Sequence, residues 1–346
     1  MTQLIHETNA SRGDGTGVTI VSNPLEKISF AIKFDRGWLS ILKNALDNSQ
    51  TNSDITHLEV LSIVMTPKDW VEFMSIENLW KTVVAIKFHH NQISDSVIKL
   101  IASKLAAAAV PALESIQMTF QEFTADGVIE FARVALPGSK ITHLNLGNND
   151  YVVDWSKGME ALSNALPLMS YLVSLNIVSS GLGDVGLTSL ANVLHKVPTL
   201  RMLHLHDNNV GNAGTVSLAA ALPMSNITWI SLSGNEIEDE GVKALARALP
   251  SSNLKSLYLN NNKNIGNEGA KALARALPTS ILENLGLDSS ILTDEGAVAF
   301  ANVIADSQIK YLTMRSKGIT LAVGIKALKS VFHACWDHVV CQTNNK

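Results

Sequence analysis

Two patterns of apolar and polar residues alternate along the chain. In the stretch ITWISLSGN (227–235), Ile230 and Leu232 alternate with polar or aromatic residues, and this period of two is typical of a short strand. Shortly afterwards, apolar residues recur at i, i+3, i+4 and i+7, which predicts one apolar face of a helix: Val242, Leu245, Ala246 and Leu249. The sequence therefore predicts a strand, a turn and a helix in this region.

This strand-and-helix pattern repeats. The decapeptide GVKALARALP (241–250) recurs as GAKALARALP (269–278), and a strand template of the form L-x-x-L-x-L-x-x-N precedes each copy. Successive templates begin 27 to 31 residues apart, at Leu25, Ile55, Val83, Leu113, Ile141, Leu172, Leu200, Ile227, Leu254, Leu282 and Ile309. We therefore expect eleven repeats. The predicted regions are a polar N-terminal segment or cap (1–24), the repeat array (25–322), and a C-terminal capping helix with a tail (323–346).

Polar and helix-breaking residues mark the ends of the predicted elements. Asparagine ends several strand templates, where its amide can hydrogen-bond backbone groups as the chain turns: Asn91, Asn149, Asn208, Asn235 and Asn262. A glycine preceded by Asp, Glu or Asn follows, as in EDEG, GNEG and TDEG, and such residues cap a helix N-terminus. Proline stops the helix at equivalent points: Pro137, Pro167, Pro223, Pro250 and Pro278.

A strand–turn–helix repeat of this length cannot bury its own apolar face, so the repeats must stack. Stacked strands lie about 4.8 Å apart and helices about 10 Å apart, so the array is expected to bend into a horseshoe with strands on the concave side. The L-x-x-L-x-L-x-x-N strand, the spacing and the helix motif resemble leucine-rich repeats of the ribonuclease-inhibitor subtype. The expected fold class is an α/β leucine-rich-repeat solenoid.

Several repeats depart from the pattern. Lys33 and Ile63 take the asparagine position in the first two repeats, which we interpret as an N-terminal cap, and other residues replace it later: Ser180, Ser290 and Lys317. The repeat that begins at Ile141 carries extra residues in DYVVDWSKG (150–158), which are expected to bulge from a loop.

Composition excludes several classes of function. The 346 residues are 46% hydrophobic with a formal net charge of −4, which gives no reason to expect nucleic acid or membrane lipid as a partner. The N-terminal residues lack the basic start and apolar run of a signal peptide. Only Cys335 and Cys341 are cysteines, so no disulfide framework is expected. We expect a soluble cytoplasmic protein in a reducing compartment.

The strand pattern also predicts which side chains lie on the concave face. The third, fifth, seventh and eighth template positions include six of the ten histidines, and they include aromatic residues of the kind that dominate interfaces. Such positions can simply face water, but Trp229 and Met202 have no reason to line a purely solvated surface. The predicted partner-binding residues are His57, Lys87, His89, His143, Met202, His204, His206, Asp207, Trp229, Tyr258, Asp288, Tyr311 and Arg315.

Cofactor and catalytic signatures are weak. HLHDN (204–208) places two imidazoles on one strand face, but no further zinc ligand is well placed beside them. In HACWDHVVC (333–341), a helix would point the possible ligands in different directions, and Val331, Phe332, Cys335 and Val339 are better interpreted as covering the last repeat. We find no phosphate-binding loop and no nucleophile–base set. The sequence therefore predicts no enzyme activity, no metal, no cofactor and no small-molecule substrate.

Three functions are compatible with the resemblance. The favoured one is a protein-interaction module that engages a partner protein on its concave face. Stand-alone arrays that resemble this one occur both in eukaryotic cells and among effectors that intracellular bacteria deliver into the host cytosol. The second is a GTPase activator similar to the Ran GTPase activators, although the C-terminal CQTNNK is not the acidic tail of that family. The third is the sensor part of a nucleotide-binding innate receptor, whose nucleotide-binding domain is absent here.

Overall fold

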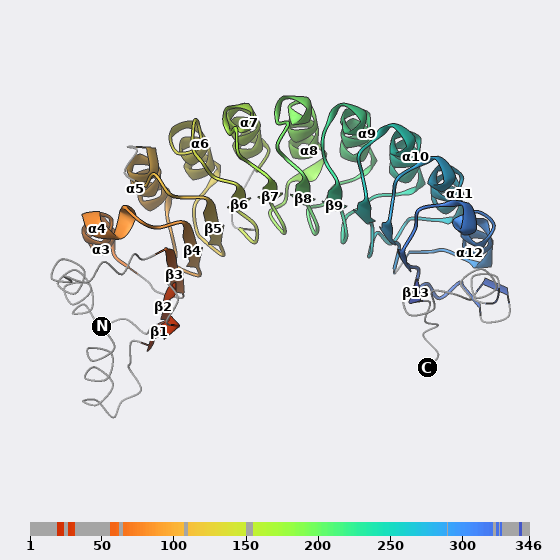
Figure 1. Ribbon diagram of the computed structural model, residues 1–346, viewed down its shortest axis with the longest axis horizontal. Helices are drawn as coiled ribbons and strands as arrows, with labels where there is room; N and C mark the ends of the chain where they lie inside the picture. Colours follow the sequence, from red (N-terminus) through yellow and green to blue (C-terminus); the bar gives the residue numbers. More distant parts are fainter. Residues whose placement is uncertain are drawn as a thin grey trace. The chain divides into compact units, whose positions relative to one another are not determined.

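A computed structural model of the chain describes residues 19–23, 27–31, 56–61, 65–106, 110–149, 155–288, 290–320, 323–324, 326 and 339–340. The chain divides into two compact units, Met1–Leu172 and Val173–Lys346. In each unit, strands and helices alternate along the chain, and the helices lie on one side of the strands (Figure 1). We call the other side of the strands the open face.

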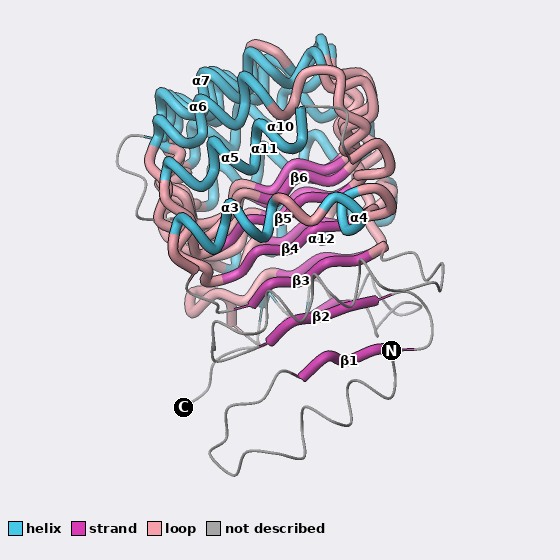
Figure 2. The backbone as a smooth tube through the Cα atoms, turned by 90° about the vertical axis from the view of Figure 1, so that its left-hand side faces the viewer, coloured by secondary structure: helices cyan, strands magenta, loops and turns pink. Residues whose placement is uncertain are grey.

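The first unit begins with an antiparallel pair that the sequence did not predict, β1 (Thr19–Asn23) against β2 (Lys27–Ala31). From β2 onward the strands pair in parallel: β3 (His57–Leu61), β4 (Ala85–His89), β5 (Ser115–Thr119) and β6 (His143–Asn145). The helices are α3 (Pro67–Met74), α4 (Glu77–Trp80), α5 (Asp95–Ala106), α6 (Ala125–Val134) and α7 (Trp155–Ala165), and Figure 2 shows α5 to α7 stacked over the strands.

The second unit repeats the same arrangement. Its parallel strands are β7 (Ser174–Asn176), β8 (Met202–His204), β9 (Trp229–Ser231), β10 (Ser256–Tyr258), β11 (Asn284–Gly286), β12 (Tyr311–Thr313) and β13 (Val339–Val340). Its helices are α8 (Gly183–Ala191), α9 (Asn212–Ala221), α10 (Asp239–Ala248), α11 (Asn267–Ala276) and α12 (Asp294–Ala301). The predicted prolines lie just beyond the α-helices: Pro250, for example, lies in the short 3₁₀ turn Leu249–Ser251 that ends α10.

The core of the second unit lies between the strands and the helices. Leu257 of β10 and Leu245 of α10 are both fully buried, as the two periodicities predict. The equivalent residues of neighbouring repeats share this burial: Leu203, Ile230, Leu285 and Leu312 on the strands, and Leu218, Leu273 and Phe300 on the helices. Each repeat therefore buries its apolar face against the next one.

Truncation of Leu257 is expected to be costly. Leu257→Ala should lower the free energy of unfolding by about 2–5 kcal/mol, because it removes buried methyl groups and leaves a cavity that close-packed neighbours cannot fill. Urea denaturation of the variant and the wild type measures this difference. A variant as stable as the wild type would contradict the burial of this position.

Buried asparagines hold the turns after the strands, as the sequence predicts. The side chain of Asn235 accepts hydrogen bonds from the backbone N–H groups of Asn208 and Val210, both at 3.0 Å, and donates to the carbonyl of Leu205 at 3.0 Å. Two replacements were not predicted. In one repeat the side-chain oxygen of Gln121 accepts a hydrogen bond from the backbone N–H of Asn91, at 3.1 Å. In the last repeat the hydroxyl of Ser316, rather than the side chain of Lys317, donates a hydrogen bond to the carbonyl of Leu292, at 2.7 Å.

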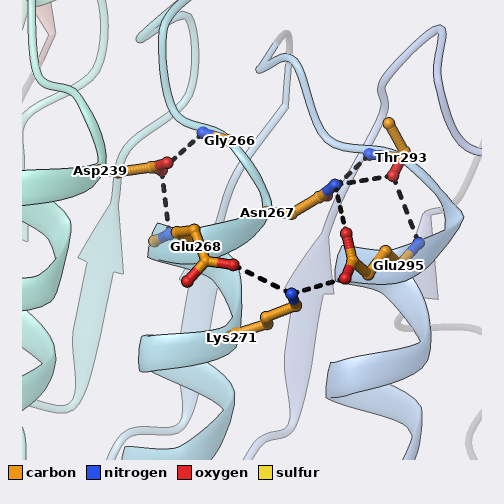
Figure 3. Close-up of polar contacts among 8 residues, drawn as sticks. Asp239, Gly266, Asn267, Glu268, Lys271, Thr293 and Glu295 are labelled. Carbon is orange, nitrogen blue, oxygen red and sulfur yellow. Dashed lines mark hydrogen bonds and ion pairs between the residues drawn. The ribbon is translucent and has the colours of Figure 1, made fainter.

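The polar residues at the helix starts cap the next helix along the stack. Figure 3 shows Asp239, the first residue of α10, whose Oδ1 accepts hydrogen bonds from the N–H groups of Gly266 (2.7 Å) and Gly269 (2.9 Å). Asn267 likewise accepts from the N–H of Thr293, at 3.1 Å. The prediction that such residues cap a helix N-terminus is confirmed, but the capped helix belongs to the following repeat. Glycine is needed at 269 because a Cβ there would lie 2.7 Å from Asp239 Oδ1.

Several sequence predictions fall outside the described residues. These include Lys33, Ile63, the insertion 150–154, and the cysteine-containing segment with Cys335 and Cys341. Within the predicted C-terminal capping helix, Val339 and Val340 form strand β13, which pairs with β12. The helix itself stays a prediction.

Candidate functional site

The strand registers of the second unit place the predicted site residues in rows on the open face. The third template position gives one row, consisting of Ser174, Met202, Trp229, Ser256, Asn284 and Tyr311. The fifth position gives the neighbouring row, consisting of Asn176, His204, Ser231, Tyr258, Gly286 and Thr313. Residues of consecutive repeats therefore lie side by side, about 4.8 Å apart along each row.

Three rings from consecutive repeats meet on this face. The ring centroids of His204 and Trp229 are 4.3 Å apart, and those of Trp229 and Tyr258 are 5.5 Å apart, each pair in a tilted arrangement. The sequence predicts this proximity, since Trp229 and Tyr258 stand on adjacent strands with an offset of two residues. We call His204, Trp229 and Tyr258 the Trp229 cluster. Each of the three side chains is only partly buried, so the cluster presents aromatic surface on the open face.

Asp207 lies next to this cluster in a special backbone conformation. Its φ angle of 57° is in the left-handed region, which aspartate tolerates. A Cβ on Gly234, in the next repeat, would lie 1.9 Å from Asp207 Oδ1. Glycine is therefore required at 234, both for this close approach and because its own φ is 66°. The carboxylate thus lies over the turn that follows β9.

Asp288 and Arg315 form an ordered ion pair on the same face. Asp288 Oδ2 accepts hydrogen bonds from Arg315 Nε (2.9 Å) and Nη2 (2.7 Å), and Oδ1 accepts from the backbone N–H of Arg315 (2.8 Å). This pairing raises the pKa of Arg315. Asp288 is itself nearly buried, whereas about half of the Arg315 side chain is exposed. Asp288 therefore orients Arg315, and the guanidinium is the group that the open face presents.

Burial lowers the pKa of both histidines in this region. For His204 the main cause is desolvation, with repulsion from His206 adding to it, and for His206 desolvation outweighs the attraction of Asp207. Both imidazoles are therefore held in the neutral form to lower pH than in the unfolded chain, where they titrate near pH 6.5.

These shifts predict how stability depends on pH. Because the folded pKa lies below the unfolded value, the stabilising contribution of neutral His204 and His206 is complete above about pH 6.5. It is lost as the pH falls through the folded pKa. We expect the double variant His204→Gln/His206→Gln to lose less stability than the wild type when the pH falls from about 7.5 to 5. Urea denaturation of both proteins across this pH range measures the difference. Parallel profiles of unfolding free energy against pH would contradict the lowered pKa of the two histidines.

The first unit carries the other predicted residues. His57 and His143 are exposed, with each ring nitrogen Nδ1 near the hydroxyl of the preceding threonine, at 2.9 and 2.8 Å. Lys87 and His89 lie on β4, and the pKa of His89 is lowered by burial and by nearby His90 and Lys87. The structure does not bring these residues into a single contact group. It does join His89 to a ring cluster with His90 and Phe120, two residues that are not among the predicted partner-binding residues.

No membrane-spanning or metal-binding feature stands out in the part of the chain that the structure describes. Within it, no helix has the length and apolar character needed to cross a bilayer. The same residues contain no group of three or more His, Cys, Asp or Glu side chains placed to hold a metal ion.

Comparison with known proteins agrees with the repeat pattern. A family model described as "Leucine Rich repeat" matches residues 169–191, 224–246 and 251–274. The comparison with curated protein sequences found no match. The family match identifies leucine-rich repeats in these three segments. The alternating parallel strands and helices are those of an α/β leucine-rich-repeat solenoid.

Two solved structures illustrate the range of similar chains. One is titled "Leiomodin-1 Actin-Binding Site 2 (ABS2)", with 20% identity, a TM-score of 0.37, and coverage of 44% of this chain and 89% of that one. The other is the complex of Rad7 and Elc1 in yeast, with 15% identity, a TM-score of 0.47, and coverage of 78% of this chain and 71% of that one.

Proposed function

We propose that this protein binds a partner protein through the open face of its strands. The observation that carries the proposal is the Trp229 cluster, in which three rings from three consecutive repeats lie together with partly exposed surface. Tryptophan and tyrosine supply large, rigid contact areas and are enriched among the residues that dominate binding energy. A solvated strand face gives no reason for such a cluster.

The residues around the cluster suit a protein partner. His206 and Asp207 extend it on one side, and the oriented guanidinium of Arg315 lies on the same face two strands beyond Tyr258. An aromatic centre with polar groups around it is the usual anatomy of a binding hot spot. We propose that Met202 and Tyr311 complete this surface, and that His57, Lys87, His89 and His143 contribute contacts in the first unit.

Site-specific crosslinking tests the proposal. A photoreactive amino acid at Ser233, on the open face between His206 and Asn260, is expected to crosslink a partner in cells. The same group at Ala220, which is exposed on α9, serves as the matched control. Crosslinks to a common protein from Ala220, with none from Ser233, would place the binding surface on the helices instead.

We further propose the ribonuclease-inhibitor-like subtype, because helices of 8 to 10 residues separate strands that recur every 27 or 28 residues in the second unit. In this proposal the chain is a non-catalytic cytoplasmic scaffold. The more specific role of a secreted bacterial effector in a host cell rests on the family resemblance alone.

A further inference from the structure

Phe120 occupies a backbone conformation that phenylalanine disfavours. It is the eighth residue of its template, and this position has a positive φ angle in seven described repeats. The other residues at this position are His90, Asn148, Ser179, Asp207, Gly234 and Asn261. Glycine, asparagine, aspartate and histidine are the residues that most readily adopt the left-handed region, and serine is small. Phe120, with φ of 56°, is the one bulky apolar residue among them.

Burial of the side chain in the core does not offset this backbone strain. Phe120 is 37% exposed, whereas the nearby Phe123 is fully buried. The Phe120 ring instead stacks on His90, with centroids 4.4 Å apart and planes 21° apart, and it contacts the edge of His89 at 4.9 Å. A residue that breaks a local conformational preference without packing into the core is typical of a functional position.

The charges around this ring cluster favour an acidic partner. On the open face of β3 to β6, Glu59 is the only carboxylate at the third, fifth, seventh and eighth template positions, and it is the register partner of Lys87. The other ionisable groups at these positions are all imidazoles: His57, His89, His90 and His143. Lys87 lies beside the single carboxylate, and no other acidic side chain at these positions would oppose a negatively charged ligand.

We propose that Phe120, stacked on His90 and His89, anchors a second docking surface in the first unit, and that its partner is an acidic protein segment carrying an aromatic or large apolar side chain. That side chain packs on the exposed ring of Phe120, and its neighbouring carboxylate binds the imidazoles and Lys87. The proposal rests on the proposed function in one respect, namely that the open face binds proteins.

A single nucleic-acid strand would also stack on aromatic rings. Such binding requires a groove of several cationic groups along the backbone. This face has one lysine, paired in register with a carboxylate, and the chain as a whole carries a net charge of −4. The protein segment is therefore the better fit.

The test is selection of random linear dodecapeptides displayed on phage against the full-length chain at neutral pH. We expect enriched peptides that combine an acidic residue with an aromatic or large apolar one.

The affinity of these peptides should fall about tenfold or more in Phe120→Asn, since an anchoring aromatic is lost. The melting temperature of Phe120→Asn should be unchanged or higher, because asparagine relieves the backbone strain, so lost binding cannot be attributed to unfolding. Tyr171→Asn, which removes another exposed aromatic ring of the same unit, is the matched control and should bind normally.

The outcomes separate this inference from the proposed function. Peptides that depend on Phe120 and not on Trp229 or Tyr258 support the second docking surface. Peptides that depend only on Trp229 and Tyr258 leave the proposed function standing and overturn the inference. If no selected peptide depends on either surface, the result counts against both the inference and the proposed function. Phe120-dependent binding of a fluorescent oligothymidine, in place of acidic peptides, would overturn the assignment of the partner.

Discussion

The double variant Trp229→Ala/Tyr258→Ala is expected to lose capture of the partner protein while its melting temperature changes little. Each hot-spot aromatic contributes about 2 kcal/mol or more to binding, so the two together correspond to about a thousandfold loss of affinity. The fold should tolerate the change because both side chains lie on the open face, outside the core formed by Ile230 and Leu257. Quantitative affinity capture from cell lysate, with wild type and variant side by side, measures the effect.

The control for this experiment lies on the helices. Lys243→Ala is suitable because Lys243 forms a surface ion pair, at 2.9 Å, only with Glu240 of its own helix among the described residues. Lys271 is less suitable, since it joins Glu268 (3.0 Å) and Glu295 (2.6 Å) and so links two repeats. A double variant that captures the partner at wild-type affinity would place the interface elsewhere. A double variant that unfolds would show that the two rings are structural.

Most of the fold could be predicted from periodicity. The alternation around Ile230 and the i, i+3, i+4, i+7 stripe through Leu245 each mark a buried face, and the structure buries both residues completely. A repeat amplifies this signal, since each pattern recurs at nearly constant spacing. The antiparallel strand β1 carried no such signal, because it stands outside the repeated template.

The candidate site was predictable where it depended on register. Equal spacing along parallel strands fixes which residues become neighbours, and this sufficed to bring Trp229 beside Tyr258. The role of Asp288 was less accessible, since its pairing with Arg315 depends on side-chain rotamers. The same holds for Asp239, whose carboxylate reaches forward to Gly269 of the next repeat.

The backbone strain at Phe120 could not be predicted directly, because a sequence shows no φ angle. Comparison of the eighth template position among repeats, where asparagine, aspartate and glycine recur, is the signal that could have revealed it.

Asn262→Ala is expected to lower the free energy of unfolding by about 3–5 kcal/mol, a large share of the stability of an ordinary domain. Asn262 is fully buried, and its side chain serves two repeats at once. Its Oδ1 accepts a hydrogen bond from the N–H of Ile237, at 3.0 Å. Its Nδ2 donates to the carbonyls of Leu232 and Leu259, both at 2.9 Å.

Alanine at this position removes all three hydrogen bonds and leaves a small cavity. The N–H of Ile237 then has no acceptor in a buried environment, and a buried donor without a partner costs about 1–3 kcal/mol. The carbonyl of Leu232 is less affected, because the side chain of Asn235 also donates to it, at 2.9 Å. The carbonyl of Leu259 also keeps a hydrogen bond from the backbone N–H of residue 262, at 3.4 Å. Most of the loss therefore comes from the Ile237 N–H and the cavity. Urea denaturation measures the total.

Two further variants show whether the cost comes from burial and hydrogen bonding or from the residue type alone. Asn264→Ala removes an exposed asparagine from the same loop. Its side chain donates a hydrogen bond to the surface carboxylate of Glu238, at 3.1 Å, and its loss should cost about 0.5 kcal/mol or less. Asn262→Asp keeps the shape and the acceptor for Ile237 but turns two donors into a carboxylate facing the carbonyls of Leu232 and Leu259. It should be strongly destabilised at neutral pH and recover partly in acid, where a protonated carboxyl can donate one hydrogen bond. Equal stability of the Asn262→Ala and Asn264→Ala variants would show that the buried asparagines are not what holds one repeat to the next.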